Sequence, residues 1–396
     1  MGQYQRASTG EPDGLTCLIV FLGSAAFCIY TVAGYPLLLA LLARRHRHPV
    51  VRSARRARVS VILPVYNGER WIGPKLESIL DLDYPLELME ILVVSDGSTD
   101  ATESIAGEFS KRANVHVLRM PRRGKAAALN LALDRAQGEI LFFTDVRQLL
   151  DRDSLRHLVE CFADSTVGVA SGELVIREGE GIEEASVGLY WKYEKWIRKQ
   201  LSSVDSVLGA TGCIYAMRRD LAVRLPEGTL VDDMYLPLAA FFRGYRVILE
   251  DAAKAYDYPT RLASEFRRKV RTLAGVYQVI GQYPALLGPS NRMWIHFFSH
   301  KLARLLMPFA MIAAAVTGYC LPGPWNRYAI AAQGLFYLLA LADSWLPGDG
   351  LLKRLTSAVR IFTVLMAASL CAVSILFLPS RILWKETRVS AARQVD

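Results

Sequence analysis

The stretch from Val59 to Asp100 reads VSVILPVYNGERWIGPKLESILDLDYPLELMEILVVSDGSTD and decides the fold class. Val59–Val65 is a short apolar run rich in β-branched residues, and Glu90–Ser95 is a second run of the same kind. Trp71–Leu80, which lies between them, has the spacing of an amphipathic helix. Strand, helix and strand joined by short connections favour a parallel sheet that carries helices on both faces.

The same alternation continues beyond this stretch. Val115–Leu118 is a weaker third apolar run and Glu139–Thr144 is a fourth, with helical patterns at Thr102–Lys111 and Lys125–Ala136. Ligands of such sheets bind at the carboxyl ends of the strands. The residues that follow each apolar run are therefore the candidates for a functional site.

The first two runs both end in polar residues. The first continues into Pro64, Tyr66 and Glu69, and the second ends in Asp96 followed by Gly-Ser. A carboxylate at this edge can accept hydrogen bonds from a nucleobase imide or a ribose, and Tyr66 can stack on a base. Taken alone, the sequence DGSTD is equally consistent with a turn that caps the helix beginning at Thr102.

Two further candidates follow along the chain. Lys125 opens an Ala-rich helix directly after a glycine, which places an ammonium group beside helix N-terminal amides and predicts an anion or nucleotide site. The spacing of a Walker A motif is absent, and a solvated lysine is the alternative. Asp145 follows the fourth run, where a carboxylate can hold Mg²⁺ or Mn²⁺ against a diphosphate.

The composition indicates a mixed protein with a soluble part and a membrane part. The chain has 396 residues, of which 52% are hydrophobic and 21% are charged, and the net charge is +9. These values exclude disordered, collagenous and disulfide-scaffold proteins. No nucleic-acid partner is expected, because zinc-finger spacing, an RNP motif and a basic heptad region are all absent.

The N-terminal region predicts a membrane span. Leu15–Ala43 contains no charged residue over 29 positions, which is long enough to cross a bilayer. Seven arginines stand between residues 44 and 58, against Arg6 alone before the span, so the following domain is expected in the cytoplasm. A buried helix of a soluble protein is the alternative.

The C-terminal region is again apolar. Asn291–His300 has the pattern of an interfacial amphipathic helix. Three further spans are expected, at Leu305–Trp325, Tyr328–Ala342 and Ile361–Ser380. The expected domains are therefore an N-terminal transmembrane helix at 1–45, a soluble domain at 46–287, and an interfacial helix with about three transmembrane helices at 288–396.

The ordered motifs PVYN, SDGSTD, RGKAAALN and FTD resemble those of the family 2 glycosyltransferases, which have the GT-A fold. The similarity covers roughly residues 59–275. It is strongest to the membrane-embedded hyaluronan, chitin, cellulose and nodulation-oligosaccharide synthases. The resemblance implies a Rossmann-like α/β domain with a mostly parallel sheet. It also implies inverting transfer from a nucleotide sugar, usually a UDP-sugar, in a multi-pass protein of the cell's inner membrane.

The resemblance also assigns roles by position. The residues expected to bind the nucleotide are Pro64, Tyr66, Glu69, Asp96 and Lys125. Asp145 matches the first Asp of the DxD motif, which lies at the ribose, the diphosphate and a Mg²⁺ or Mn²⁺ ion. Arg147 stands where the family has the second Asp of that motif. An arginine cannot ligate a metal, although it can contact phosphate directly.

The downstream motifs are less complete. Asp232 and Asp233 resemble the acidic pair whose last member is the catalytic base, and Gly212 falls in the segment that lines the acceptor pocket. Arg268 and Arg271 fall where the synthases carry QxxRW, but Thr272 replaces the Trp. An acidic helix N-terminus and a basic helix on anionic lipids are the alternatives for these two clusters.

The sequence thus predicts an inverting glycosyltransferase that acts on a lipid-linked or growing glycan acceptor among membrane lipids. Asp233 is the expected general base, and Asp232 and Arg271 are the expected further catalytic residues. The alternatives are a processive polysaccharide synthase, which the missing Trp disfavours, and a non-catalytic nucleotide-sugar-binding assembly subunit, which Arg147 favours.

Overall fold

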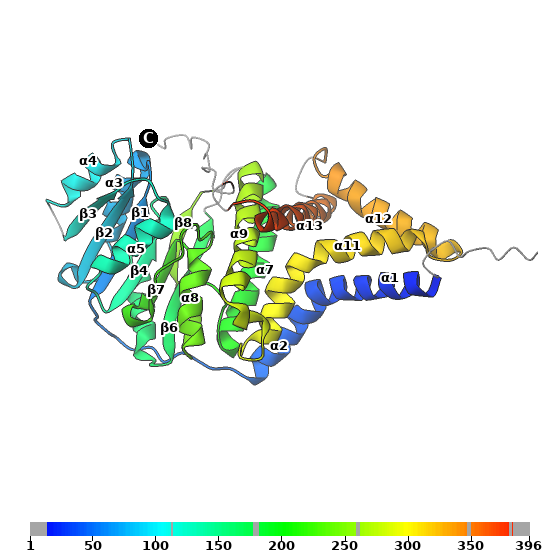
Figure 1. Cartoon of the computed structure of the whole chain (residues 1–396), viewed down its shortest axis with the longest axis horizontal. Coiled ribbons are helices and arrows are strands. Elements are labelled where there is room, and N and C mark those ends of the chain that lie inside the picture. Colours follow the sequence, from blue (N-terminus) through cyan, green and yellow to red (C-terminus); the bar gives the residue numbers. More distant parts are fainter. Residues whose placement is uncertain are drawn as a thin grey trace, which may run out of the picture.

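The computed structural model describes residues 14–111, 114–176, 182–258, 262–346, 350–379 and 382, and its described strands form one eight-stranded sheet (Figure 1). The strand order is β3-β2-β1-β4-β7-β6-β8-β5. The strands are β1 (Val59–Val65), β2 (Met89–Asp96), β3 (Val115–Met120), β4 (Ile140–Thr144), β5 (Leu149–Leu150), β6 (Val167–Ile176), β7 (Ile214–Arg218) and β8 (Arg246–Asp257).

The sheet has a parallel half and a mixed half. Strands β1 to β4 pair in parallel, as the alternation of strands and helices predicts. Strand β7 then runs antiparallel to both β4 and β6, whereas β6 and β8 are parallel to one another. The sequence pattern indicates only the parallel half, because strict alternation of strand and helix ends after β4.

Side-chain alternation along the strands explains why both faces of the sheet are covered. Val61 and Leu63 of β1 pack on the side of α3 (Glu69–Leu80), whereas Ile62 packs on the side of α5 (Lys125–Arg135). All three side chains are fully buried, as expected for a strand between two helical layers. The remaining helices beside the sheet are α4 (Thr102–Phe109), α6 (Ser154–Glu160) and α8 (Asp232–Phe242).

Among the described residues, three helices are long and apolar enough to cross a membrane, and they span Gly14–Arg45, Trp294–Tyr319 and Leu351–Leu376. The first contains α1 (Gly14–Ile29) and α2 (Tyr35–Arg45), joined by a π-helical turn. The second runs from α10 (Trp294–His296) through a π-helical segment, Phe297–Leu302, into α11 (Ala303–Tyr319). The third contains α13 (Leu351–Ala372), and the 19-residue α12 (Pro324–Ala342) lies between the second and the third.

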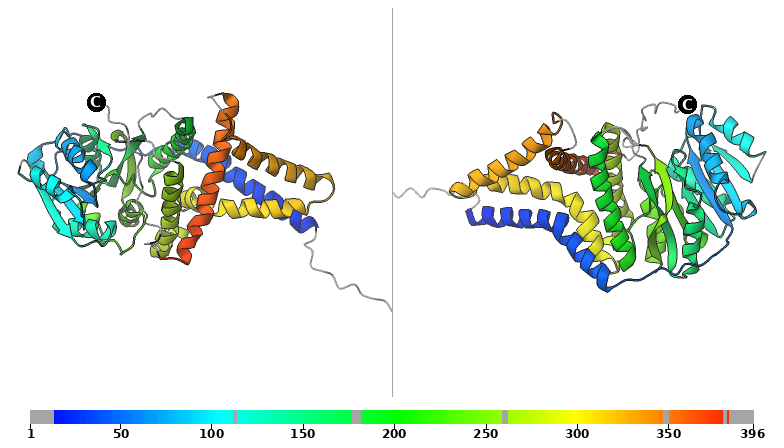
Figure 2. Two further views of the ribbon diagram at one scale, coloured as in Figure 1. Left: turned by 90° about the horizontal axis from the view of Figure 1, so that it is seen from above. Right: turned by 180° about the vertical axis from the view of Figure 1, so that it is seen from behind.

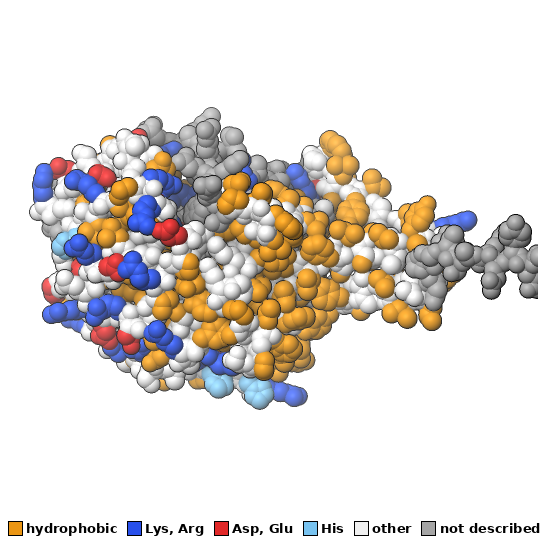
Figure 3. Space-filling view, viewed as in Figure 1, with side chains coloured by type: hydrophobic (Ala, Val, Ile, Leu, Met, Phe, Trp, Pro, Cys, Tyr) orange, Lys and Arg blue, Asp and Glu red, His pale blue; other side chains and the backbone are white. Residues whose placement is uncertain are grey.

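Two helices stand between the sheet and these apolar helices (Figures 1 and 2). They are α7 (Ile182–Val204) and α9 (Leu262–Gln282). Helix α7 packs against α2 and α13, and α9 packs against α13. Figure 3 shows that charged side chains gather over the sheet, whereas hydrophobic side chains cover the apolar helices.

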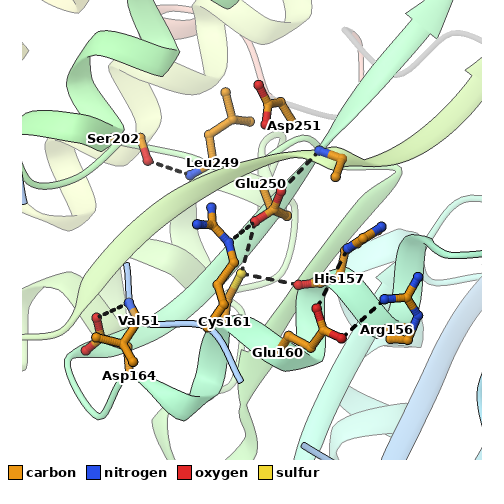
Figure 4. A network of polar contacts seen from close by, with 12 residues as sticks. Val51, Arg156, His157, Glu160, Cys161, Asp164, Ser202, Leu249, Glu250 and Asp251 are labelled. Carbon is orange, nitrogen blue, oxygen red and sulfur yellow. Dashed lines mark hydrogen bonds and ion pairs between the residues drawn. The ribbon is translucent and has the colours of Figure 1, made fainter. Parts of the chain in front are cut away.

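Residues 46–58, which we call the strap, run in extended form from α2 to β1 along the edge of the domain (Figure 1). The Arg52 Nε atom donates to the buried carboxylate of Glu250 over 2.7 Å. The Cys161 thiol donates to the same carboxylate (Figure 4). The Val51 amide donates to Asp164 over 3.3 Å. At least one of the seven arginines between residues 44 and 58 therefore holds the strap against the soluble domain.

Candidate active site

The carboxyl ends of β1, β2 and β4 bring the candidate residues together at one edge of the sheet. Asp96 ends β2 and is 2% exposed, so its carboxylate depends on hydrogen bonds within the protein. It accepts hydrogen bonds from the backbone amides of Arg123, over 2.7 Å, and Gly124, over 2.9 Å. Asp96 thus fixes the loop that precedes Lys125.

Arg122 extends this arrangement to Tyr66. Its guanidinium forms an ion pair with Asp96 and lies 3.4 Å from the centre of the Tyr66 ring. Gly97 allows this close approach, because its φ is +70° and a Cβ atom there would lie 2.7 Å from the Arg122 amide nitrogen. The sequence analysis predicts no role for Arg122, although it stands three residues before Lys125.

Lys125 joins two carboxylates that are far apart in the sequence. Its Nζ atom lies 2.9 Å from Asp145 Oδ1, after β4, and 3.2 Å from Asp232 Oδ2, at the start of α8. Burial alone would lower the pKa of Lys125, but the negative charges of Asp145 and Asp232 raise it. The Lys125 ammonium therefore carries its charge at the centre of this cluster.

Asp233 lies beside the same cluster. Burial and the neighbouring charge of Asp232 raise the pKa of the Asp233 carboxyl group to about 6, although Lys125 opposes this shift. A Cβ atom on Gly212 would lie 2.9 Å from Asp233 Oδ2, so only a glycine leaves this carboxylate its present position. Such a carboxylate is suited to accept a proton near neutral pH.

Arg271 comes from α9 and completes the charged group. Burial lowers the pKa of its guanidinium, and the charges of Asp233, Asp145 and Asp232 oppose that shift. Three carboxylates and two cations from distant parts of the chain therefore share one site. Arg268, one turn earlier, forms an ion pair with Glu265 over 2.8 Å.

Two residues that are expected to bind the nucleotide also have partners within the protein. The carboxylate of Glu69 accepts a hydrogen bond from the Ala101 amide over 3.1 Å, and the Glu69 amide donates to Asp100 over 3.0 Å. Pro64 lies within β1, opposite Val94 of β2. Glu69 thus links the start of α3 to the loop between β2 and α4.

The residues present fit a divalent ion that is shared with a substrate diphosphate. Among the described residues, no three His, Cys, Asp or Glu side chains come together as a ligand set. Asp145 offers one carboxylate with a 38% exposed side chain, and Mg²⁺ commonly takes one or two carboxylates and fills its other positions with phosphate and water. Arg147 forms an ion pair with Asp257 at the end of β8, over 2.5 Å.

The sequence reading missed Asp257 as well as Arg122. Asp257 ends strand β8, and a carboxylate at a strand end is a pattern that predicts a site residue. Strand β8 itself was not predicted, because it lies beyond the region where strands and helices alternate regularly. Gln148 also donates to Asp257, over 2.8 Å. Asp257 therefore holds the loop that follows Asp145.

Comparison with known proteins shows what the domain is similar to. Residues 60–225 match the family model "Glycosyl transferase family 2". The chain is 24% identical over 368 residues to beta-monoglucosyldiacylglycerol synthase of Synechocystis sp.. The aligned region covers 85% of this chain and 76% of that protein. It is 32% identical over 268 residues to poly-beta-1,6-N-acetyl-D-glucosamine synthase of Staphylococcus epidermidis, which covers 66% of this chain and 62% of that protein.

One solved structure is similar over nearly the whole chain. It is the mannosyltransferase PcManGT from Pyrobaculum calidifontis in complex with GDP-Man and Mn²⁺, with a TM-score of 0.70 and 26% identity. The match covers 90% of this chain and 99% of that chain. The expected GT-A fold is confirmed, with apolar helices before and after the domain along the chain.

Proposed function

We propose that this chain, whose residues 60–225 form a domain of glycosyl transferase family 2, transfers a sugar from a nucleotide sugar to a lipid-linked or growing glycan acceptor at a membrane. The observation that carries the proposal is the position of Lys125 between Asp145 and Asp232, with Asp233 and Arg271 around it. Such a group of cations and carboxylates suits a reaction that separates a diphosphate from a sugar.

The donor is a nucleoside diphosphate sugar. The similar mannosyltransferase holds GDP-Man, and the family resemblance favours a UDP-sugar. The nucleobase of the donor lies against Tyr66 and Arg122, whose side chains stack on one another. Asp96 holds the Arg122 side chain in place. The diphosphate then extends toward Lys125 and Asp145, where Mg²⁺ or Mn²⁺ would be held.

The reaction is an inverting displacement. Asp233 takes the proton of the acceptor hydroxyl, and the resulting oxygen forms a bond to the anomeric carbon from the face opposite the diphosphate. The bond between that carbon and the diphosphate oxygen breaks, and the electron pair leaves with the nucleoside diphosphate. Lys125 and Arg271 offset the charge that develops on this leaving group. A metal at Asp145, when bound, would supply further neutralisation of the diphosphate.

A test compares nucleoside diphosphate release by the detergent-purified natural chain and by Asp233→Asn, with UDP- and GDP-sugars as donors. We expect the variant to bind nucleotide normally and to lose activity by about 10²- to 10⁴-fold. Equal rates in the two proteins would remove Asp233 from the role of base.

The structure favours addition of one or few sugars over processive synthesis. Thr272, which replaces the Trp of the synthases, is exposed and donates its hydroxyl to the Arg268 carbonyl over 2.9 Å. It cannot supply an aromatic platform for a growing polymer. Sizing the product made from a radiolabelled donor separates the two activities, since a single species is expected and a ladder would indicate a synthase.

A further inference from the structure

A polar pocket lies where the soluble domain meets the second apolar helix. It lies between α7, the loop at residues 207–209 and the start of the Trp294–Tyr319 helix, and its empty space of about 310 Å³ is partly open to solvent. Its polar lining consists of Glu194, Arg198, His296, His300 and Lys301. Helix α7 thus contributes one charged wall, and the apolar helix contributes the other.

The negative charge in this pocket already has partners. The carboxylate of Glu194 lies 2.8 Å from Arg304 Nη1 and 3.3 Å from His300 Nε2. Glu194 therefore forms its direct contacts with Arg304 and His300, and this single negative charge is shared with the other cations of the pocket.

Two further cations lack such a carboxylate. Arg198 donates to neutral oxygens, namely Thr211 Oγ1 over 2.9 Å, Ser171 Oγ over 3.1 Å and the Gly209 carbonyl over 3.4 Å. Within the described residues, the Lys301 ammonium forms neither a hydrogen bond nor an ion pair. Both side chains are partly buried. Removing a cation from water is costly unless an anion joins it, so the pocket is suited to bind a negatively charged group.

The pocket adjoins the proposed base. Gly209 lines it, and the next residue, Ala210, donates its amide to the Asp233 carbonyl over 2.6 Å. The positive charge of Lys301 also acts on the Asp233 carboxylate. An anionic group bound here would hold the rest of its molecule next to Asp233.

The surroundings of the pocket indicate a lipid. Lys301 belongs to a helix that is apolar enough to cross a membrane, and charged residues in such helices usually mark a binding site. Leu201, Val207 and Leu208 form the apolar lining. Exposed hydrophobic side chains, including Trp294, Ile295 and Phe298, continue along the same helix.

We propose that this pocket binds the phosphate of an anionic lipid acceptor, with Arg198 and Lys301 as its ligands, and so places an acceptor hydroxyl beside Asp233. This inference rests on the proposed function and specifies the chemistry of its acceptor. The acyl chains of the lipid would lie along the Trp294–Tyr319 helix.

The test measures binding of short-chain phosphatidylglycerol and short-chain diacylglycerol to the detergent-purified full chain. The two lipids share acyl chains and a free hydroxyl but differ in the phosphate. We expect phosphatidylglycerol to bind at least tenfold more tightly, and we expect Lys301→Met to lose about tenfold of that affinity, as for other charge-assisted contacts. Equal binding of both lipids, or an unchanged affinity in Lys301→Met, would overturn the proposal.

Matched controls separate loss of the site from loss of the fold. Arg354→Met removes an exposed cation from α13, outside the pocket, and should leave lipid binding unchanged. Lys301→Arg should restore most of the binding, and nucleotide affinity should be the same in all variants. Inorganic phosphate should bind much more weakly than the lipid, and equally tight binding would show that the occupant is a soluble anion instead.

The two proposals fail in different ways. If nucleotide sugars are never turned over but the lipid binds as expected, the proposed function is wrong and the anion site remains. If turnover occurs with uncharged lipids and phosphate gives no advantage in binding, the glycosyltransferase proposal stands and the anion site is wrong.

Discussion

At the scale of single residues, the position of Asp233 determines how activity should depend on pH. Its pKa is raised to about 6, and a general base acts only when it is deprotonated. We therefore expect kcat/KM to fall about tenfold for each pH unit below 6 and to be level between about pH 7 and pH 8. Nucleoside diphosphate release measured from pH 4.5 to pH 8 checks this. A profile that is level down to pH 5 would contradict the assignment.

The contact between Gly212 and Asp233 gives a second prediction. Gly212→Ala would bring a methyl group within 2.9 Å of Asp233 Oδ2, so the carboxylate must move. A displaced base costs on the order of 10²-fold in kcat, whereas the proposed nucleotide site around Asp96 is untouched. Kinetics and nucleotide titration of the purified variant should therefore show a reduced kcat with an unchanged nucleotide Kd. Gly107→Ala, at a site with open space around the glycine, is the matched control.

Arg147 gives a third prediction, which concerns metal binding. Arg147→Asp would place a second carboxylate two residues after Asp145 and remove the partner of Asp257. We expect Mn²⁺ to bind the variant more tightly than the natural chain, because carboxylates are the ligands that hard cations prefer. Titration with Mn²⁺ followed by electron paramagnetic resonance measures this without any turnover. Identical affinities would show that position 147 does not face the ion.

At the scale of elements, the buried carboxylate of Glu250 is one of the groups that hold the strap to the soluble domain. Glu250→Ala removes the acceptor of Arg52 and Cys161, and both would then lose a partner (Figure 4). We expect a loss of roughly 1–3 kcal/mol in the free energy of unfolding, together with faster proteolysis within residues 46–58. Limited digestion followed by mass spectrometry locates the cut. Glu87→Ala, at an exposed residue of a short 3₁₀ turn, should digest like the natural chain.

Much of the parallel half of the sheet could be predicted from the sequence. Val59–Val65 is strand β1 with the same bounds, and Trp71–Leu80 lies within α3. These elements carry strong periodic patterns and short connections. They deliver Asp96, Lys125 and Asp145 to the site, as the resemblance implies.

The other half could not be predicted, because its order depends on pairing between distant segments. Strand β7 joins the sheet between β4 and β6 in the antiparallel sense, and no local pattern specifies that placement. The same is true of the pocket at Arg198 and Lys301. These two residues belong to no motif and meet only because α7 packs near the start of the second apolar helix.

At the scale of the whole molecule, the distribution of hydrophobic side chains predicts how the protein is extracted from cells. Three helices have the length and composition of membrane spans, and Figure 3 shows hydrophobic side chains over them. We expect the chain to stay in the pellet after washes with high salt or alkaline carbonate and to dissolve in detergent. Immunoblotting of the fractions measures this. Release by salt alone would indicate a peripheral protein held by its positive charge.

Helix α7 lies against both the catalytic domain and the apolar helices, and this has a kinetic consequence. If the acceptor arrives through the bilayer, it is concentrated or diluted on a surface, while the nucleotide sugar arrives from the surrounding solution. The reaction rate should then follow the mole fraction of acceptor among the lipids, and adding inert lipid at a fixed total amount of acceptor should slow the enzyme.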